Sequence, residues 1–208
     1  MQESSFYSDE KPLKDQKDNP TRQTRNTLMA LADAIIPRTP LLAEEYGKIQ
    51  FFGAPDLNTD EYIILSLNQY AHLANLAAEL LNAAARQLVS ENGNHRNLNF
   101  AVYPEGDAFA ALAPEDRIRA LNLLETLKID FADLPVIFQE NPELVLHITG
   151  RLNRFIVMGY YSEWSGYGAT RMKPPDQRRL EYFPLSWKQA GYPGPSLGYR
   201  AIEITNIK

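Results

Sequence analysis

The strongest pattern in the chain is a periodic row of apolar residues between Thr59 and Ser90. Apolar side chains recur there at alternating steps of four and three, the spacing of one face of an α-helix. The row comprises Ile63, Leu67, Tyr70, Ala74, Ala77, Leu81, Ala84 and Leu88. With Thr59 as N-cap and Asn92-Gly93 as the stop, Gly93 taking the left-handed position, this predicts one helix over residues 59–90, about 45 Å long.

Local start and stop signals predict further helices. One runs from Thr21 to Ile36, where Pro37 ends it because proline cannot continue the hydrogen-bond ladder. Asp107 is expected to cap a short helix that runs through Leu112, and another helix begins at Pro114, a residue suited to the first helical position. Asn141-Pro142-Glu143 begins a long helix that reaches about Tyr161. Residues 37–58, between the first two helices, are expected to form an irregular connection.

A weak strand pattern lies between these helices, where Leu98, Phe100 and Val102 alternate with Asn97, Asn99 and Ala101. A strand needs a partner and the sequence offers no clear one, so an extended loop is an equally good interpretation.

The two ends of the chain differ in composition. Residues 1–20 are polar and charged, with Phe6, Tyr7 and Leu13 as their large apolar residues, which predicts a flexible tail. Residues 164–208 combine five glycines and five prolines with Trp164 and Trp187, which is too aromatic for a disordered tail. We therefore expect an all-α fold: a single domain over 21–208, with an irregular bundle around the 59–90 helix and the 164–208 segment wrapped over it.

Composition excludes several functions. The 208 residues have a formal net charge of −5, which argues against nucleic acid as a partner because phosphate binding needs a basic surface. There is no cysteine, which excludes disulfides and thiolate chemistry. No apolar run approaches the roughly 18 residues that span a bilayer, so the chain is expected not to span the membrane. The N-terminus shows neither a signal-peptide apolar stretch nor paired arginines.

No complete catalytic, cofactor-binding or metal-binding set emerges from the sequence. The histidines are His72, His95 and His147. Glu143 and His147 are four residues apart and share a helix face, so they could begin a metal site, and a metal-dependent hydrolase is one alternative function. Arg151, on the next turn of that face, opposes this reading. Asp33 is interpreted as making a polar contact near a helix end or with a nearby loop.

Aromatic residues of the C-terminal segment are the candidate partner-binding residues, because Trp, Tyr and Arg are favoured anchors of protein interfaces. They are Trp164, Tyr167, Trp187 and Tyr192. The alternative is that these rings cover the helices of their own domain. A free-standing helical interaction module is accordingly a further possible function.

Several stretches resemble the gluconate 2-dehydrogenase subunit 3 family. Leu28-Met29-Ala30-Leu31-Ala32-Asp33-Ala34-Ile35-Ile36-Pro37 is similar to its opening motif, and Gly53-Ala54 falls near a Gly-Ala step. Leu112-Ala113-Pro114-Glu115-Asp116-Arg117 is similar to its central motif. The stretches 159–167 (GYYSEWSGY) and 191–195 (GYPGP) are similar to its C-terminal aromatic signatures. Together, in this order, the matches cover most of residues 25–200.

The resemblance implies a helical accessory subunit that itself carries no flavin, haem or metal. It would bind and stabilise the large FAD-dependent catalytic subunit of a sugar or sugar-acid dehydrogenase, in a complex in which a cytochrome subunit often takes the electrons. Many members carry a twin-arginine export signal, which implies help with export and a periplasmic or cell-envelope location. This chain departs from the family there, because no such signal is visible in it.

Overall fold

The computed structural model describes residues 19–194, and every regular element in this range is helical, with no strand among them. This confirms the predicted all-α class. Residues 1–18, which make up nearly all of the predicted flexible tail, lie outside the described range, as do residues 195–208 of the predicted C-terminal segment. The longer helices are α1 (Arg22–Ile35), α3 (Thr59–Ala71), α4 (Ala74–Ser90), α6 (Pro114–Glu125) and α8 (Pro142–Tyr161).

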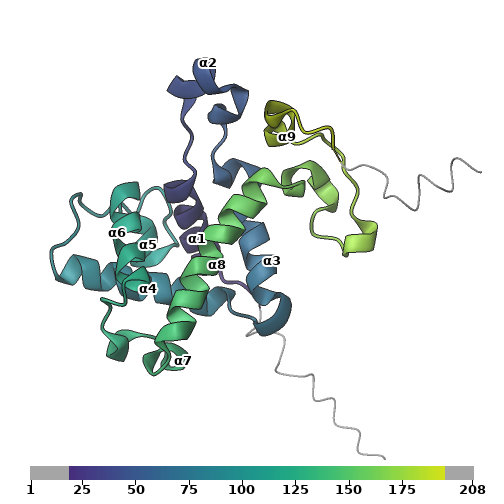
Figure 1. Cartoon of the computed structure of the whole chain (residues 1–208). Coiled ribbons are helices and arrows are strands. Elements are labelled where there is room, and N and C mark those ends of the chain that lie inside the picture. The colour runs from purple at the N-terminus through teal and green to yellow at the C-terminus, as the bar shows by residue number, and fades with distance from the viewer. Residues whose placement is uncertain (1–18, 195–208) are drawn as a thin grey trace, which may run out of the picture.

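Shorter elements connect these helices (Figure 1). The short α-helices are α2 (Ala43–Tyr46), α5 (Asp107–Ala111), α7 (Val136–Gln139) and α9 (Leu185–Ala190). The 3₁₀ turns are η1 (Pro40–Leu42), η2 (Lys48–Phe51), η3 (Ala54–Leu57), η4 (Phe131–Asp133), η5 (Trp164–Thr170) and η6 (Pro175–Gln177).

Helix starts follow the capping signals. The Thr21 hydroxyl accepts a hydrogen bond from the Thr24 amide at 3.0 Å and so caps α1. The Asn141 side chain accepts one from the Leu144 amide at 3.1 Å and caps α8. Pro114 takes the first position of α6. These three starts are confirmed because each depends on residues within three positions of the helix start. The predicted cap at Asp107 is wrong, since Asp107 is the first residue of α5 and Gly106 precedes it.

The prediction of one continuous helix over 59–90 is wrong. His72 adopts the left-handed conformation (φ 48°, ψ 45°), which ends α3. The Asn68 side chain accepts a hydrogen bond from the Ala74 amide at 2.9 Å, so a first-turn donor of α4 is satisfied although no residue caps that helix locally. The apolar spacing continues through the break and therefore conceals it.

The ends of these two helices also differ from expectation. Asn58 precedes α3 in the left-handed conformation, and Thr59 is its first residue rather than its cap. After α4 the left-handed residue is Asn92 (φ 54°) and not Gly93. The Gly93 amide instead donates to the Leu88 carbonyl at 2.8 Å, where a methyl group on Gly93 would meet the Leu88 side chain.

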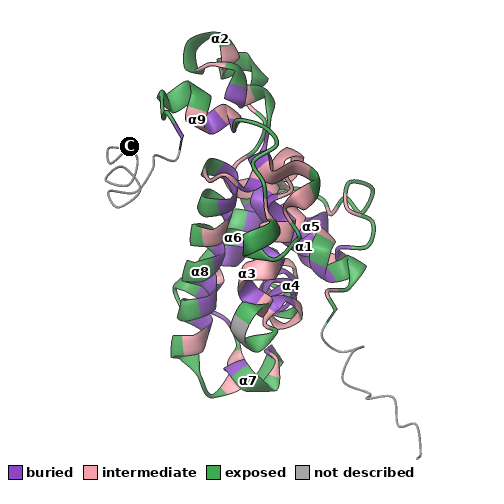
Figure 2. Cartoon of the chain, turned by 90° about the vertical axis from the view of Figure 1, so that its right-hand side faces the viewer, coloured by how far each residue is buried: buried purple, intermediate pink, exposed green. Residues whose placement is uncertain are grey.

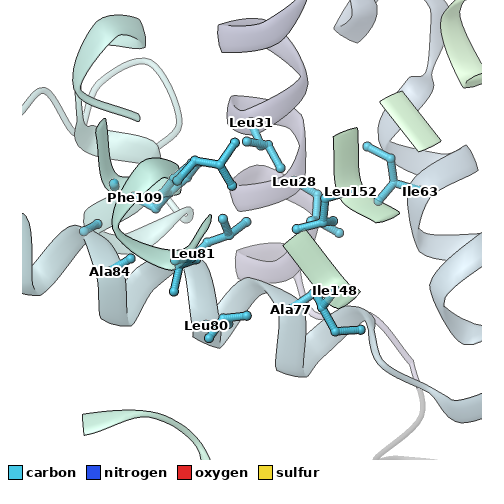
Figure 3. Packing of buried hydrophobic residues seen from close by; sticks show 14 of the residues in the cluster. Leu28, Leu31, Ile63, Ala77, Leu80, Leu81, Ala84, Phe109, Ile148 and Leu152 are labelled. Carbon is cyan, nitrogen blue, oxygen red and sulfur yellow. The ribbon is translucent and has the colours of Figure 1, made fainter. Parts of the chain in front are cut away.

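Helix α1, rather than the 59–90 segment, is the centre of the bundle. It contacts α3, α4, α5, α6 and α8, because the break at His72 lets α3 and α4 pack on different parts of it. Figure 1 shows α4, α5 and α6 on one side of α1 and α3 on the other, with α8 running across the front. The core between them is shown in Figure 3 and includes Leu28, Leu31, Ile63, Ala77, Leu80, Leu81, Ala84, Phe109, Ile148 and Leu152.

The 97–102 segment is a loop, as the alternative interpretation had it. Phe100 and Val102 are exposed, and the Asn99 amide donates to the Ala111 carbonyl at 2.8 Å as an isolated contact.

A closed loop leaves the bundle between α1 and η3. Its two ends are joined by a hydrogen bond from the Ala54 amide to the Ile36 carbonyl at 2.9 Å. Gly53 lies in this neck, where a Cβ atom would come within 3.0 Å of the Arg38 nitrogen and 3.1 Å of the Ile36 oxygen. The Tyr160 hydroxyl donates to the Phe52 carbonyl at 2.8 Å and fixes the neck to α8. Residues 37–52 thus project as a unit that contains η1, α2 and η2.

Candidate protein interface

The C-terminal segment is attached to the bundle by Trp164. This side chain is buried, and its indole Nε1 donates to the Asn58 carbonyl at 2.8 Å. Its ring packs edge to face on Tyr62, with the two centroids 5.3 Å apart. Trp164 therefore connects η5 to the start of α3 and packs within its own chain.

Close backbone packing at Gly166 shapes the rest of the segment. The Gly166 carbonyl accepts hydrogen bonds from the amides of Glu181 and Tyr182 at 2.8 and 2.9 Å. A Cβ atom on Gly166 would lie 2.5 Å from the Tyr182 oxygen, so a larger residue would push the segment around Gly166 away from the segment around Tyr182. Nearby, Arg171 Nε lies 2.6 Å from Glu61 Oε2 and joins the segment to α3.

Helix α9 is held against the end of α8 by Trp187, whose Nε1 donates to the Tyr161 carbonyl at 3.1 Å. Phe183 and Tyr192 both pack edge to face on this indole, with centroids 5.7 and 4.8 Å away. Gly191 ends α9 in the left-handed conformation (φ 70°) and reverses the direction of the chain. The Tyr192 amide then donates to the Trp187 carbonyl at 2.9 Å. The result is a partly exposed row of three rings.

We call residues 37–52 together with residues 182–192 the aromatic lobe. The two parts touch, since the Gln189 side chain donates to the Tyr46 carbonyl and α9 contacts η2. Figure 2 shows α2 and α9 side by side beyond one end of the bundle. The exposed apolar residues of the lobe are Leu41, Leu42, Tyr46, Phe51, Phe52, Tyr182, Phe183 and Tyr192. Leu41 is 95% exposed.

A groove of about 310 Å³ runs between the two parts of the lobe and the end of α8. Ile49 and Gln50 line it from the loop, Tyr160 and Tyr161 from α8, and Ala190 from α9. So many large apolar side chains exposed together are typical of a surface that binds another protein.

The four predicted interface residues differ in how far they are exposed. Trp164 is buried, and Tyr167 is partly buried beside it, with the Arg178 guanidinium within 6.0 Å of both rings. Trp187 is partly exposed and Tyr192 is exposed, and both belong to the aromatic lobe. The role of these four residues in partner binding stays a prediction. For Trp164 this role would be support of its neighbours, because its own ring is covered.

Sequence reasoning missed the other half of the lobe. Residues 37–58 were interpreted as a connection, although they carry the pairs Leu41-Leu42 and Phe51-Phe52. The signal that could have found them is the placement of adjacent large apolar residues between Pro40 and Gly53. Adjacent side chains point in different directions, so the two residues of such a pair cannot both face the core in a short irregular segment.

A second cluster centres on Arg117, which is buried on α6. Its Nη1 donates to the Ala30 carbonyl at 3.1 Å and lies 3.3 Å from Asp33 Oδ2, while its Nη2 donates to the Ala110 carbonyl at 2.8 Å. The guanidinium carbon lies 5.2 Å from the centre of the Tyr103 ring. Burial lowers the pKa of Arg117 and raises the pKa of Tyr103 to about 12, so at neutral pH Tyr103 is protonated. The predicted polar contact of Asp33 is thus an ion pair, and the cluster joins α1, α5 and α6.

Glu143 and His147 do not come together as a metal site. His147 Nε2 accepts a hydrogen bond from Arg151 Nε at 2.7 Å, so its partner is the cation on the next turn. Residues 19–194 contain no group of three or more His, Asp or Glu side chains that could hold a metal ion. Within the same range, no helix has the length and apolarity needed to cross a membrane.

Comparisons of the chain with known protein families, with curated proteins and with solved structures found no match. The resemblance to the gluconate 2-dehydrogenase subunit 3 family therefore rests on the quoted stretches alone.

Proposed function

We propose that this chain is a non-catalytic accessory subunit that binds and stabilises the FAD-containing catalytic subunit of a sugar or sugar-acid dehydrogenase. The observation that carries the proposal is the aromatic lobe. It exposes large apolar side chains, yet hydrogen bonds at Tyr160 and Trp187 fix it to the bundle and that of Gln189 joins its two parts. A surface that is held in shape before binding loses less conformational entropy when a partner docks.

Several stretches that carry the family resemblance take up specific structural positions. Asp33 of the opening motif pairs with Arg117 of the central motif. Gly53-Ala54 forms the neck of the projecting loop, and Gly191-Tyr192 ends α9 in the lobe. Motif residues that hold the bundle and the lobe together are what a binding subunit needs. This supports the proposed relationship to the family.

In this role the chain would act through binding energy alone. A partner that binds the folded state of the catalytic subunit raises its stability by mass action. Oxidation of the sugar at FAD and electron transfer to a cytochrome subunit would take place in the other chains. Assistance with export, and a periplasmic or cell-envelope site of action, belong to the same proposal.

The test is affinity capture of the tagged chain from its native cells, followed by visible absorbance and mass spectrometry of the eluate. A large co-eluting protein with the absorbance of oxidised flavin is the expected result. Cell fractionation in the same experiment locates the complex. Elution with a different, flavin-free partner would contradict the dehydrogenase assignment and favour the free-standing interaction module.

A further inference from the structure

The outer face of α8 is exposed from one end of the helix to the other. Figure 2 shows it at the edge of the molecule, with its buried positions turned toward the bundle. Residues at helical spacing share this face, and all of them are exposed. They are Glu143, Leu146, Gly150, Arg154, Val157 and Tyr161. The face is therefore mixed: Leu146, Gly150 and Val157 alternate with Glu143 and Arg154, and the exposed His147 and Arg151 lie along its edge.

Gly150 lies at the centre of this face. A glycine inside a helix lowers its stability, and no contact within residues 19–194 requires one at this position. Glycine is, after proline, the least favourable residue in a helix interior. A Cβ atom on Gly150 would meet nothing within 4 Å. Gly159 of the same helix differs, because a Cβ there would lie 3.0 Å from the Tyr62 ring. The small size of Gly159 thus serves packing within the chain, whereas that of Gly150 suits a backbone approaching from outside.

The charges on the face indicate what approaches. Glu143 lies in the first turn of α8 and Arg154 lies beyond its midpoint. If a second α8 crosses the first in the antiparallel direction at Gly150, Glu143 of each copy lies near Arg154 of the other. Leu146 of each copy then lies near Val157 of the other. A parallel crossing would instead bring Arg154 close to Arg154, which is unfavourable.

We propose that two copies of this chain associate through an antiparallel crossing of their α8 helices at Gly150. The arrangement is two-fold symmetric, so each favourable contact occurs twice. A single pair of helices buries less than a standard interface, and the dimer is accordingly weak and depends on concentration. It uses a face that meets the aromatic lobe only at Tyr161, and it does not rest on the proposed function.

The test is sedimentation velocity of the full-length chain, purified alone, from about 5 µM to about 500 µM, a range that brackets weak association. The expected result is a shift from monomer to dimer as concentration rises. Arg154→Glu should raise the dissociation constant by more than about tenfold, since it places like charges together. Arg154→Glu combined with Glu143→Arg should restore dimerisation. Glu79→Arg, an exposed reversal on α4, is the matched control and should change nothing.

Gly150→Ala separates association from folding. Alanine favours the helix, and within residues 19–194 its methyl group would meet no other part of the fold within 4 Å, so the monomer should melt at a higher temperature. The added methyl groups should at the same time weaken the dimer. A monomer at every concentration would overturn the proposal, as would a dimer that none of these α8 substitutions affects. If the chain stays monomeric while Arg154→Glu abolishes capture of the catalytic subunit, the face binds that subunit and the proposed function survives.

Discussion

Asp33 and Arg117 stand 84 positions apart in the chain and meet in an ion pair of 3.3 Å between Oδ2 and Nη1. The same guanidinium also donates to the carbonyls of Ala30 and Ala110. Arg117 is 3% exposed, so these three acceptors take the place of water around its charge. The end of α1, the end of α5 and the start of α6 are joined by this one side chain.

Replacing Arg117 with methionine should therefore lower the free energy of unfolding by about 3–5 kcal/mol, because two buried carbonyls and the Asp33 carboxylate lose their partner. Urea unfolding followed by circular dichroism measures this. Arg22→Ala is the control, since Arg22 makes an ion pair with Glu105 at the surface and should change stability by less than about 1 kcal/mol. Equal effects of the two substitutions would show that Arg117 is not a structural link.

Asp60 should give stability an unusual dependence on pH. It is 2% exposed, and burial raises its pKa, an effect that Arg25 at 3.4 Å partly offsets. A carboxyl whose pKa is raised in the folded state contributes most to stability at acid pH, and this contribution is lost as the pH rises through that raised pKa. Asp60→Asn, which mimics the protonated form, should raise the melting temperature at neutral pH and lose this advantage below the ordinary aspartate pKa.

The control for Asp60 is Asp176→Asn, at an exposed position in η6. Thermal melts of both variants across the pH range give the comparison. If Asp60→Asn lowers the melting temperature at neutral pH, the ion pair with Arg25 outweighs the cost of burial.

The left-handed residue between α3 and α4 can be tested by substitution at His72. This side chain is exposed, so its removal loses little packing. Glycine adopts φ 48° without the strain of a Cβ atom, and His72→Gly should raise the free energy of unfolding by about 0.5 kcal/mol after its own entropy cost. His72→Val should lower it by about 1 kcal/mol, because a β-branched side chain clashes in this conformation. The opposite order would indicate one continuous helix over 59–90.

The aromatic lobe predicts a substitution that separates folding from binding. Leu41→Asp changes a side chain that is 95% exposed and should leave the free energy of unfolding within about 0.5 kcal/mol of the original. It should nonetheless reduce capture of the catalytic subunit several-fold, because a charge is introduced at an apolar interface. Val136→Asp on α7, which is 82% exposed and lies outside the lobe, is the matched control. Equal capture by both variants would place the binding surface elsewhere.

Features decided by neighbouring residues could be predicted from the sequence. The caps at Thr21 and Asn141 and the start at Pro114 depend on a few adjacent positions, and the all-α class follows from helical spacing repeated along the chain. The break at His72 could not be predicted, because Leu67, Ala74 and Ala77 keep the spacing of a single helix across it. What changes there is one backbone conformation and the hydrogen bond from the Ala74 amide to Asn68.

The sequence indicated only one part of the aromatic lobe, for a related reason. The aromatic composition of the C-terminal segment indicated Trp187 and Tyr192, but composition cannot distinguish an exposed ring from the buried one of Trp164. The contribution of residues 37–52 depends on contacts such as that between Gln189 and Tyr46, which join distant parts of the chain. Local pattern carries no information about such contacts.

The neck at Ile36 and Ala54 makes the projecting loop exchangeable. Its ends are already joined by a hydrogen bond, so a replacement of different length would change the closure entropy by only about 0.6 kcal/mol per doubling. The helices beneath would keep their packing while the exposed positions between Pro37 and Phe52 varied, provided that Ile49, which is buried against the core, stayed apolar. If the aromatic lobe binds a partner as proposed, substitution or insertion at the exposed positions of this segment would change half of the binding surface without rebuilding the bundle.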